Sequence, residues 1–151
     1  MFDMMRFIGF DREDEAEKWA KEMIGTPDVT GFCRVMSAVD ENDEFVCAVV
    51  FTNFSSRNVD VNVVLKPKGF DSPKEVLVLF NNVFSYVFGQ LKAVRATGLI
   101  RGKNIASKNF VEHLGFKLEG VMRKSFEDDD LHIYGFLAEE YNTHTWYRGN
   151  L

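Results

Sequence analysis

Apolar and polar residues alternate with a period of two in several short segments, which predicts strands. Residues 59–65 alternate Val and Leu with the polar Asp60 and Asn62, the pattern of a strand with one exposed face. Residues 45–51 are continuously apolar, as in a central strand that is buried on both faces. The predicted strands cover residues 4–10, 32–39, 45–51, 59–65, 93–99, 116–123 and 132–137.

Other segments follow the period of an α-helix, and their ends carry helix signals. Asp11 is a predicted N-cap. The run Ser72-Pro73-Lys74-Glu75 predicts a helix start, with Ser72 as the cap and Glu75 completing a capping box. Asn104 and Gly115 are the predicted cap and stop of the last helix. The predicted helices cover residues 11–24, 72–89 and 104–114.

The resulting order, β-α-β-β-β-α-β-α-β-β, predicts one mixed α/β domain over residues 1–151. The early strands should form an antiparallel meander because short turns join them. Residues 59–65 and 93–99 flank a helix, and such a crossover favours neighbouring parallel strands. We expect this pair to diverge at one end.

Composition supports a folded protein and excludes some function classes. The 151 residues are 46% hydrophobic and include 15 Phe, which predicts a dense aromatic core. No apolar run is long enough to span a membrane, and the early acidic residues do not fit a secretory signal, so a cytoplasmic protein is expected. The net charge of -5 argues against nucleic-acid binding, which favours basic patches. Cys33 and Cys47 lack metal-ligand spacing and are interpreted as reduced, packed thiols, and no metal site is predicted.

Residues 104–116, NIASKNFVEHLGF, form the most informative segment. An amphipathic helix that Asn104 caps and Gly115 stops explains the segment without any ligand. Four apolar side chains fall at helical spacing and can pack on a sheet, namely Ala106, Phe110, Val111 and Leu114.

The same segment and the strand after it also carry a family pattern. N-x-A-S-x-x-x-x-E-x-L-G-F, followed by K-x-E-G-x-x-R, closely resembles the C-terminal signature of the GCN5-related N-acetyltransferases (GNAT). Within this family, the chain most resembles the branch of the ribosomal-protein alanine acetyltransferases. The Y-A-F at the end of their preceding helix is similar to Tyr86-Val87-Phe88. The resemblance implies a GNAT-like, mostly antiparallel sheet of about seven strands flanked by helices, with a splayed parallel strand pair. The matching residues are Asn104, Ala106, Ser107, Glu112, Leu114, Gly115, Phe116, Glu119, Gly120 and Arg123.

This resemblance implies transfer of an acetyl group from acetyl-CoA to a primary amine by direct attack. The amine, a protein N-terminus or a small molecule, must lose a proton, and the departing thiolate gains from a nearby donor. In relatives the Asn of this motif contacts the cofactor arm and the Ser lies near the sulfur, which implies these roles for Asn104 and Ser107. Another acyl-CoA remains an open alternative.

The family's pyrophosphate loop, Q/R-x-x-G-x-G/A, is altered in this chain. Glycines at the start of a helix let bare N–H groups approach phosphate. Here Ser72-Pro73-Lys74 falls where Gly-x-Gly is expected, and Asp71 places a negative charge beside an anion site. A solvated basic loop before an ordinary capped helix explains these residues equally well. If the pyrophosphate does bind near residues 68–74, the expected contacts are Lys68, Gly69, Ser72 and Lys74.

The general base has three candidates, each with a structural alternative. Relatives of this branch carry a Glu shortly after the E-G-x-x-R strand, which points to Glu127, although a solvated acidic turn at residues 127–130 is the simpler interpretation. Asp60 lies where other branches place a base, and the alternative is a solvent-facing side of the sheet. His132 is of the residue type that titrates near neutral pH, and the alternative is a partly buried structural His.

Two functions follow from these observations. Asn104 and Ser107 favour an acetyltransferase, because folding alone does not require this pair. The altered phosphate loop favours a catalytically inactive GNAT-fold module that has lost acyl-CoA binding and serves interaction or structure.

Overall fold

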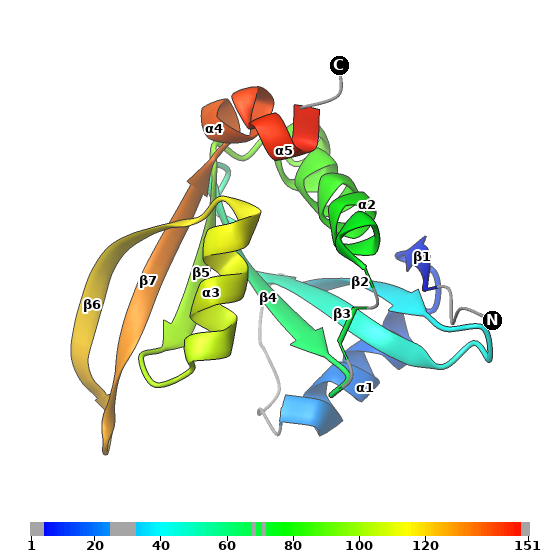
Figure 1. Ribbon diagram of the computed structural model, residues 1–151, viewed down its shortest axis with the longest axis horizontal. Helices are drawn as coiled ribbons and strands as arrows, with labels where there is room; N and C mark the ends of the chain where they lie inside the picture. Colours follow the sequence, from blue (N-terminus) through cyan, green and yellow to red (C-terminus); the bar gives the residue numbers. More distant parts are fainter. Residues whose placement is uncertain (1–4, 25–32, 68, 71, 149–151) are drawn as a thin grey trace. The chain divides into compact units, whose positions relative to one another are not determined.

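The computed structural model describes residues 5–24, 33–67, 69–70 and 72–148 (Figure 1). Its elements follow the predicted order and continue into two short C-terminal helices that the sequence did not predict. The strands are β1 Arg6–Gly9, β2 Cys33–Val39, β3 Phe45–Thr52, β4 Asn58–Leu65, β5 Arg95–Arg101, β6 Lys117–Phe126 and β7 Asp129–Leu137. The helices are α1 Glu13–Ile24, α2 Pro73–Phe84, the π-helical η1 Ser85–Gln90, α3 Ile105–Leu114, α4 Ala138–Thr143 and α5 Thr145–Arg148.

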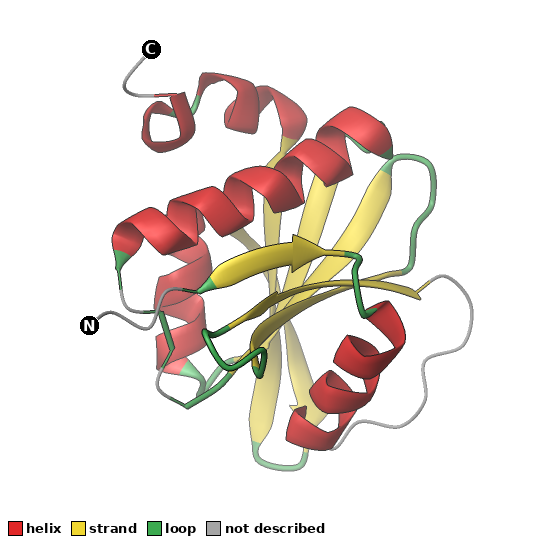
Figure 2. Ribbon diagram, turned by 90° about the vertical axis from the view of Figure 1, so that its right-hand side faces the viewer, coloured by secondary structure: helices red, strands yellow, loops and turns green. Residues whose placement is uncertain are grey.

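The seven strands form a sheet in the order β1-β2-β3-β4-β5-β7-β6, drawn in yellow in Figure 2. The β4–β5 pair is parallel and joins Asn58–Asp60 to Arg95–Thr97. Within the described chain this ladder ends at Asp60 and Thr97, although β4 continues to Leu65. The predicted mixed sheet, with a parallel pair that is joined at one end only, is confirmed.

The described chain divides into two compact units that share β4. The first unit runs up to Phe54 and includes Val61–Val83, and the second contains Ser55–Asp60 and the chain from Phe84 onward. A single domain over residues 1–151 stays a prediction.

Helix α1 covers the first unit's part of the sheet, but it begins later than predicted. Asp11 donates its backbone N–H to Ile8 in a turn, Arg12 has a φ of +56°, and the helix starts at Glu13. The Glu13 carboxylate accepts the backbone N–H of Val35 at 2.8 Å. The prediction of Asp11 as the cap is wrong, because this long-range hydrogen bond fixes the first turn in its place. The buried side chains here are Ala16, Ala20, Val35, Val39, Phe45, Ala48 and Val64.

Ser37 lies in this first unit with no exposed surface, and its Oγ has no hydrogen-bond partner among the described residues. A buried hydroxyl without a partner loses its water hydrogen bonds and gains nothing in return. We therefore expect Ser37→Ala to raise the free energy of unfolding by about 1 kcal/mol. Chemical denaturation of the parent and the variant measures this difference, and a destabilised variant would contradict the expectation.

The second unit has an aromatic core, as the 15 Phe predicted. The rings of Phe84 and Phe136 meet edge to face with 5.0 Å between their centroids. In Figure 1, α4 and α5 follow the end of β7, and Tyr147 of α5 donates its hydroxyl to the Leu114 carbonyl at 2.7 Å. These helices complete the core. Its main aromatic members are Phe84, Phe88, Phe116, Phe136, Tyr141 and Tyr147.

Two further elements of this unit depart from prediction. The helix predicted to run to residue 89 changes at Ser85 into a π-helical turn, in which the Leu91 N–H reaches the Tyr86 carbonyl. The hairpin β6–β7 is longer than predicted, so that only Glu127 and Asp128 remain as its turn.

The two cysteines lie in the first unit. Cys33 and Cys47 are both free thiols, and burial raises the pKa of Cys47 far above its usual value.

Candidate functional site

The start of α3 carries the two residues that the sequence singled out most strongly. Asn104 is the N-cap, and its Oδ1 accepts the backbone N–H of Ser107 at 3.1 Å. This geometry leaves the Nδ2 of the exposed Asn104 and the hydroxyl of the half-buried Ser107 with no partner among the described residues. Asn104 therefore caps the helix with its oxygen while its amide N–H groups stay available to a ligand.

The loop before α3 is bound to the tip of the β6–β7 hairpin. Asp129 accepts the backbone N–H of Lys103 at 3.0 Å with Oδ2 and that of Asp130 at 2.7 Å with Oδ1. Desolvation raises the pKa of Asp129, but these two donors and the nearby charges of Lys103 and Arg101 together bring it below its usual value. The interpretation of residues 127–130 as a merely solvated acidic turn is wrong for Asp129, which binds the loop backbone.

The rest of α3 is fixed to the second unit by specific contacts. Glu112 accepts a hydrogen bond from the hydroxyl of Tyr134 on β7 at 3.2 Å. Desolvation of this hydroxyl and, as a smaller effect, the negative charge of Glu112 both raise the pKa of Tyr134. Leu114 is buried, whereas Ala106 is exposed, so the prediction that Ala106 packs on the sheet is wrong. It lies in the first turn, next to Ile105, which is also exposed. The helix is therefore anchored mainly through its C-terminal half.

Asp60 belongs to a polar network on the β4–β5 pair. The Nδ2 of Asn58 donates to Asp60 Oδ1 at 3.1 Å, and the Oδ1 of Asn58 accepts from the Thr97 hydroxyl and, at 3.3 Å, from Arg95 Nε. Arg95 also pairs with Glu119 of β6 at 2.7 Å. Because Asn58 accepts on its oxygen, its amide nitrogen is oriented toward Asp60.

This network lies on the sheet face opposite α3. Gly98 of β5 faces Phe116 and Tyr134, and Tyr134 binds α3 through Glu112. Thr97 is the neighbour of Gly98 in the strand, so its side chain points to the other face, together with that of Asp60. The two candidate groups, Asp60 and Ser107, are thus carried by opposite sides of the second unit.

The other two candidates for the base have different surroundings. Glu127 is exposed in the hairpin turn and has no partner among the described residues, so no contact there joins it to Ser107. His132 lies on β7, and its Nδ1 is buried without a partner in the described part of the chain. Its Nε2 would lie 2.8 Å from a Cβ placed on Gly102, which makes it a packing partner of the β5–α3 loop.

The loop before α2 belongs to the first unit. Gly69 has a φ of +70°, and the Oγ of Ser72 accepts the backbone N–H of Glu75 at 3.3 Å, which confirms the predicted cap. Lys74 is exposed in the first turn of α2. Lys68 and Asp71, also part of the predicted phosphate site, lie outside the described residues.

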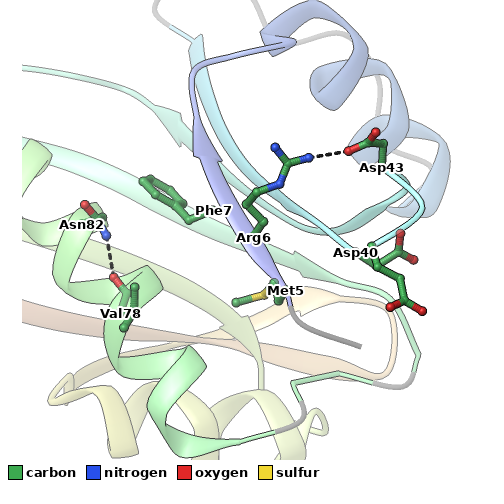
Figure 3. Close-up of a pocket in the computed structure, with 8 residues that line it drawn as sticks. Met5, Arg6, Phe7, Asp40, Asp43, Val78 and Asn82 are labelled. Carbon is green, nitrogen blue, oxygen red and sulfur yellow. Dashed lines mark hydrogen bonds and ion pairs between the residues drawn. The ribbon is translucent and has the colours of Figure 1, made fainter. Parts of the chain in front are cut away.

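The first unit also contains a groove of about 770 Å³ beside β1. Figure 3 shows Arg6 and Asp43 pointing toward one another as an ion pair, while Asp40 accepts the backbone N–H groups of Asn42 and Glu44. These carboxylates are engaged within the protein. The groove residues are Met5, Arg6, Phe7, Asp40, Glu41, Asp43, Val78 and Asn82, and none of them was a predicted site residue.

Comparison with known proteins yields a likeness of fold. No protein-family model and no curated protein matches this chain. A mutant spermidine N-acetyltransferase from Vibrio cholerae superposes with a TM-score of 0.70 at 13% identity, over 94% of this chain and 97% of that chain. An acetyltransferase of the GNAT family from Bacillus anthracis gives 0.59 at 20% identity, over 70% of this chain and 67% of that one. A protein from Acinetobacter baylyi described as an acetyltransferase gives 0.69 at 15% identity, over 92% and 96%.

The chain therefore has the GNAT acetyltransferase fold. The described residues contain no group of His, Cys, Asp and Glu side chains arranged to ligate a metal ion. None of the described helices is long and apolar enough to cross a membrane.

Proposed function

We propose that this protein is an acetyl-CoA-dependent N-acetyltransferase of the GNAT superfamily, close to the ribosomal-protein alanine acetyltransferase branch. The observation that carries the proposal is the start of α3. Asn104 Nδ2 and the Ser107 hydroxyl lie there without a partner among the described residues. These are hydrogen-bond donors suited to a carbonyl and to a thiolate. The loop before α3 is bound by Asp129, and the Leu114 carbonyl at the end of the helix accepts from Tyr147.

Acetyl-CoA supplies the acetyl thioester. The nitrogen of the amine attacks the thioester carbonyl carbon, the C–N bond forms, and the C–S bond breaks. Asn104 would donate to a carbonyl of the cofactor arm. The Ser107 hydroxyl would pass its proton to the departing thiolate and regain one from water, while the amine nitrogen loses its proton to a carboxylate. Gly69, Ser72, Lys74 and Lys68 are the proposed contacts of the pyrophosphate.

Asp60 and Glu127 are the two proposed acceptors of the amine proton. Asp60 lies on the sheet face opposite α3, so it serves only an amine that reaches the thioester from that face. Asn58 holds the Asp60 carboxylate in one orientation, whereas no contact in the described chain orients Glu127. A base that is already oriented needs less reorganisation in the transition state. The amine is a protein N-terminus or a small amine, and spermidine, the substrate named for the Vibrio protein, is one of the latter class.

Binding of acetyl-CoA is the first test. A ligand that binds only the native state raises its stability by about 2.7 kcal/mol at a hundred times its dissociation constant, so the melting temperature should rise with acetyl-CoA concentration. The altered phosphate loop implies weaker binding than a glycine-rich loop gives. Calorimetry and thermal shift with millimolar acetyl-CoA, compared with acetate at the same ionic strength, measure the effect.

An inactive module is the alternative that this experiment separates. Pro73 stands at the first position of α2 and offers no N–H to a phosphate, which favours a loss of cofactor binding. The absence of both heat and thermal shift at millimolar acetyl-CoA would establish this alternative. Product formation, followed by mass spectrometry with spermidine and with peptides, then distinguishes the amines.

A further inference from the structure

The loop between β5 and α3 is held on the hairpin tip by a small set of backbone contacts. Asp129 accepts the Lys103 N–H at 3.0 Å, one residue before Asn104. The Gly102 N–H donates to the Asp130 carbonyl at 2.9 Å. Two successive residues of the loop are therefore bound to β7 immediately before α3 begins.

Gly102 of this loop lies close to two side chains of β7. A Cβ on Gly102 would lie 2.8 Å from His132 Nε2 and 3.0 Å from Asp129 Oδ1. Such distances are shorter than ordinary carbon contacts, so only glycine fits at this position without a shift. The loop is therefore packed closely against the side chains of His132 and Asp129 just before the helix start.

We propose that Asp129 is a positioning residue for the acetyl-CoA site, in that its carboxylate fixes the backbone of Lys103 and thereby the positions of Asn104 and Ser107. This inference rests on the proposed function. Asp129 touches neither the cofactor nor the amine in this scheme. It acts through the backbone, which carries the cap Asn104 and, three residues later, the proton donor Ser107.

The neighbouring Asp128 provides a matched control. It reaches the same residue, Lys103, but only at the side-chain Nζ and at 3.4 Å, with side chains that are 76% and 66% exposed. An exposed ion pair of this kind contributes little, and it does not restrain the backbone. Asp128→Ala removes the same charge from the neighbouring position and leaves the Asp129 contacts intact.

The experiment compares the parent with Asp129→Ala, Gly102→Ala and Asp128→Ala, at a temperature where thermal melts show all four to be folded. We expect Asp129→Ala and Gly102→Ala to raise the acetyl-CoA dissociation constant and to lower turnover at saturation by about 10–10²-fold, because misplaced groups lose catalytic alignment. Asp128→Ala should stay within about twofold of the parent in both quantities. Without ligand, hydrogen exchange of the Ser107 amide should be faster in Asp129→Ala than in the parent. In Asp128→Ala it should equal that of the parent.

The readouts distinguish the two hypotheses. A parent without acetyl-CoA binding would refute the proposed function and this role with it. A parent that binds and turns over, beside a folded Asp129→Ala with the parent's dissociation constant and turnover, would refute the positioning role alone. Unchanged exchange of the Ser107 amide in Asp129→Ala would do the same, because the helix start would then not depend on this carboxylate.

Discussion

Ser107→Ala should slow acetyl transfer by about 10²–10⁴-fold, the loss typical of a positioned proton donor. The hydroxyl is half-buried at the start of α3 and has no partner within the described chain, so its removal breaks no protein hydrogen bond. Asn104 caps the backbone N–H of Ser107, which the substitution retains. The melting temperature should therefore change little, as is usual for such a change on a helix surface.

Turnover and melting temperature are measured on the same preparation, with Ser125→Ala as the control. Ser125 lies on β6, where its hydroxyl donates to the Met122 carbonyl at 2.8 Å, and it has no role in the proposed chemistry. An active parent whose rate is unchanged in Ser107→Ala would end the assignment of a catalytic role. A variant that loses stability but keeps its rate would show that Ser107 supports only the helix start.

The elements that were predicted correctly are those that local chemistry determines. Asn104 caps α3, Ser72 caps α2, and Gly115 ends α3 in a left-handed conformation with a φ of +113°. The parallel pairing of β4 with β5 follows from the crossover between them, which is a general rule of chain geometry. Each of these features depends on a few neighbouring residues or on element order alone.

The elements that were missed depend on contacts between distant residues. The start of α1 is shifted by a hydrogen bond that the Glu13 carboxylate accepts from the backbone N–H of Val35 on β2. Helices α4 and α5 are short, and they close an aromatic core that is formed by residues far away in the sequence. Short helices have little intrinsic stability, so tertiary packing decides whether they form.

The candidate site shows the same division. The pair Asn104 and Ser107 was predicted from one local motif and stays a prediction, whereas the hydrogen bonds of Asp129 to the loop backbone were hidden in a run of acidic residues that looked solvated. The Arg95–Glu119 pair joins β5 to β6 across β7, and its detection requires the strand order. A signal did exist in Gly135 of β7, because a Cβ there would collide with the Glu119 carboxylate. Without a register, that glycine could not be assigned to a partner.

Phe136→Ala should cause the largest loss of stability among the changes considered. Phe136 has no exposed surface and lies among several rings, with centroid distances of 5.0 Å to Phe84 and 5.4 Å to Phe116. Truncating a buried Phe removes its transfer free energy and leaves a cavity, which together cost about 3–5 kcal/mol. The rings around it come from α2, from Phe116 just before β6, and from α4 and α5, so the cavity cannot be filled by a shift of one side chain.

Leu118→Ala on β6 is the matched control for this change, because Leu118 is apolar but 50% exposed. Its truncation should alter the free energy of unfolding by no more than about 0.5 kcal/mol, as for most surface positions. Guanidinium unfolding of the parent and both variants, followed by near-ultraviolet circular dichroism of the aromatic side chains, measures their free energies of unfolding. A Phe136→Ala protein with the stability of Leu118→Ala would show that these rings do not form the core of the unit. A large loss confined to Phe136→Ala would instead confirm that the aromatic cluster holds α4 and α5 against the C-terminal end of α3, where Tyr147 binds the Leu114 carbonyl.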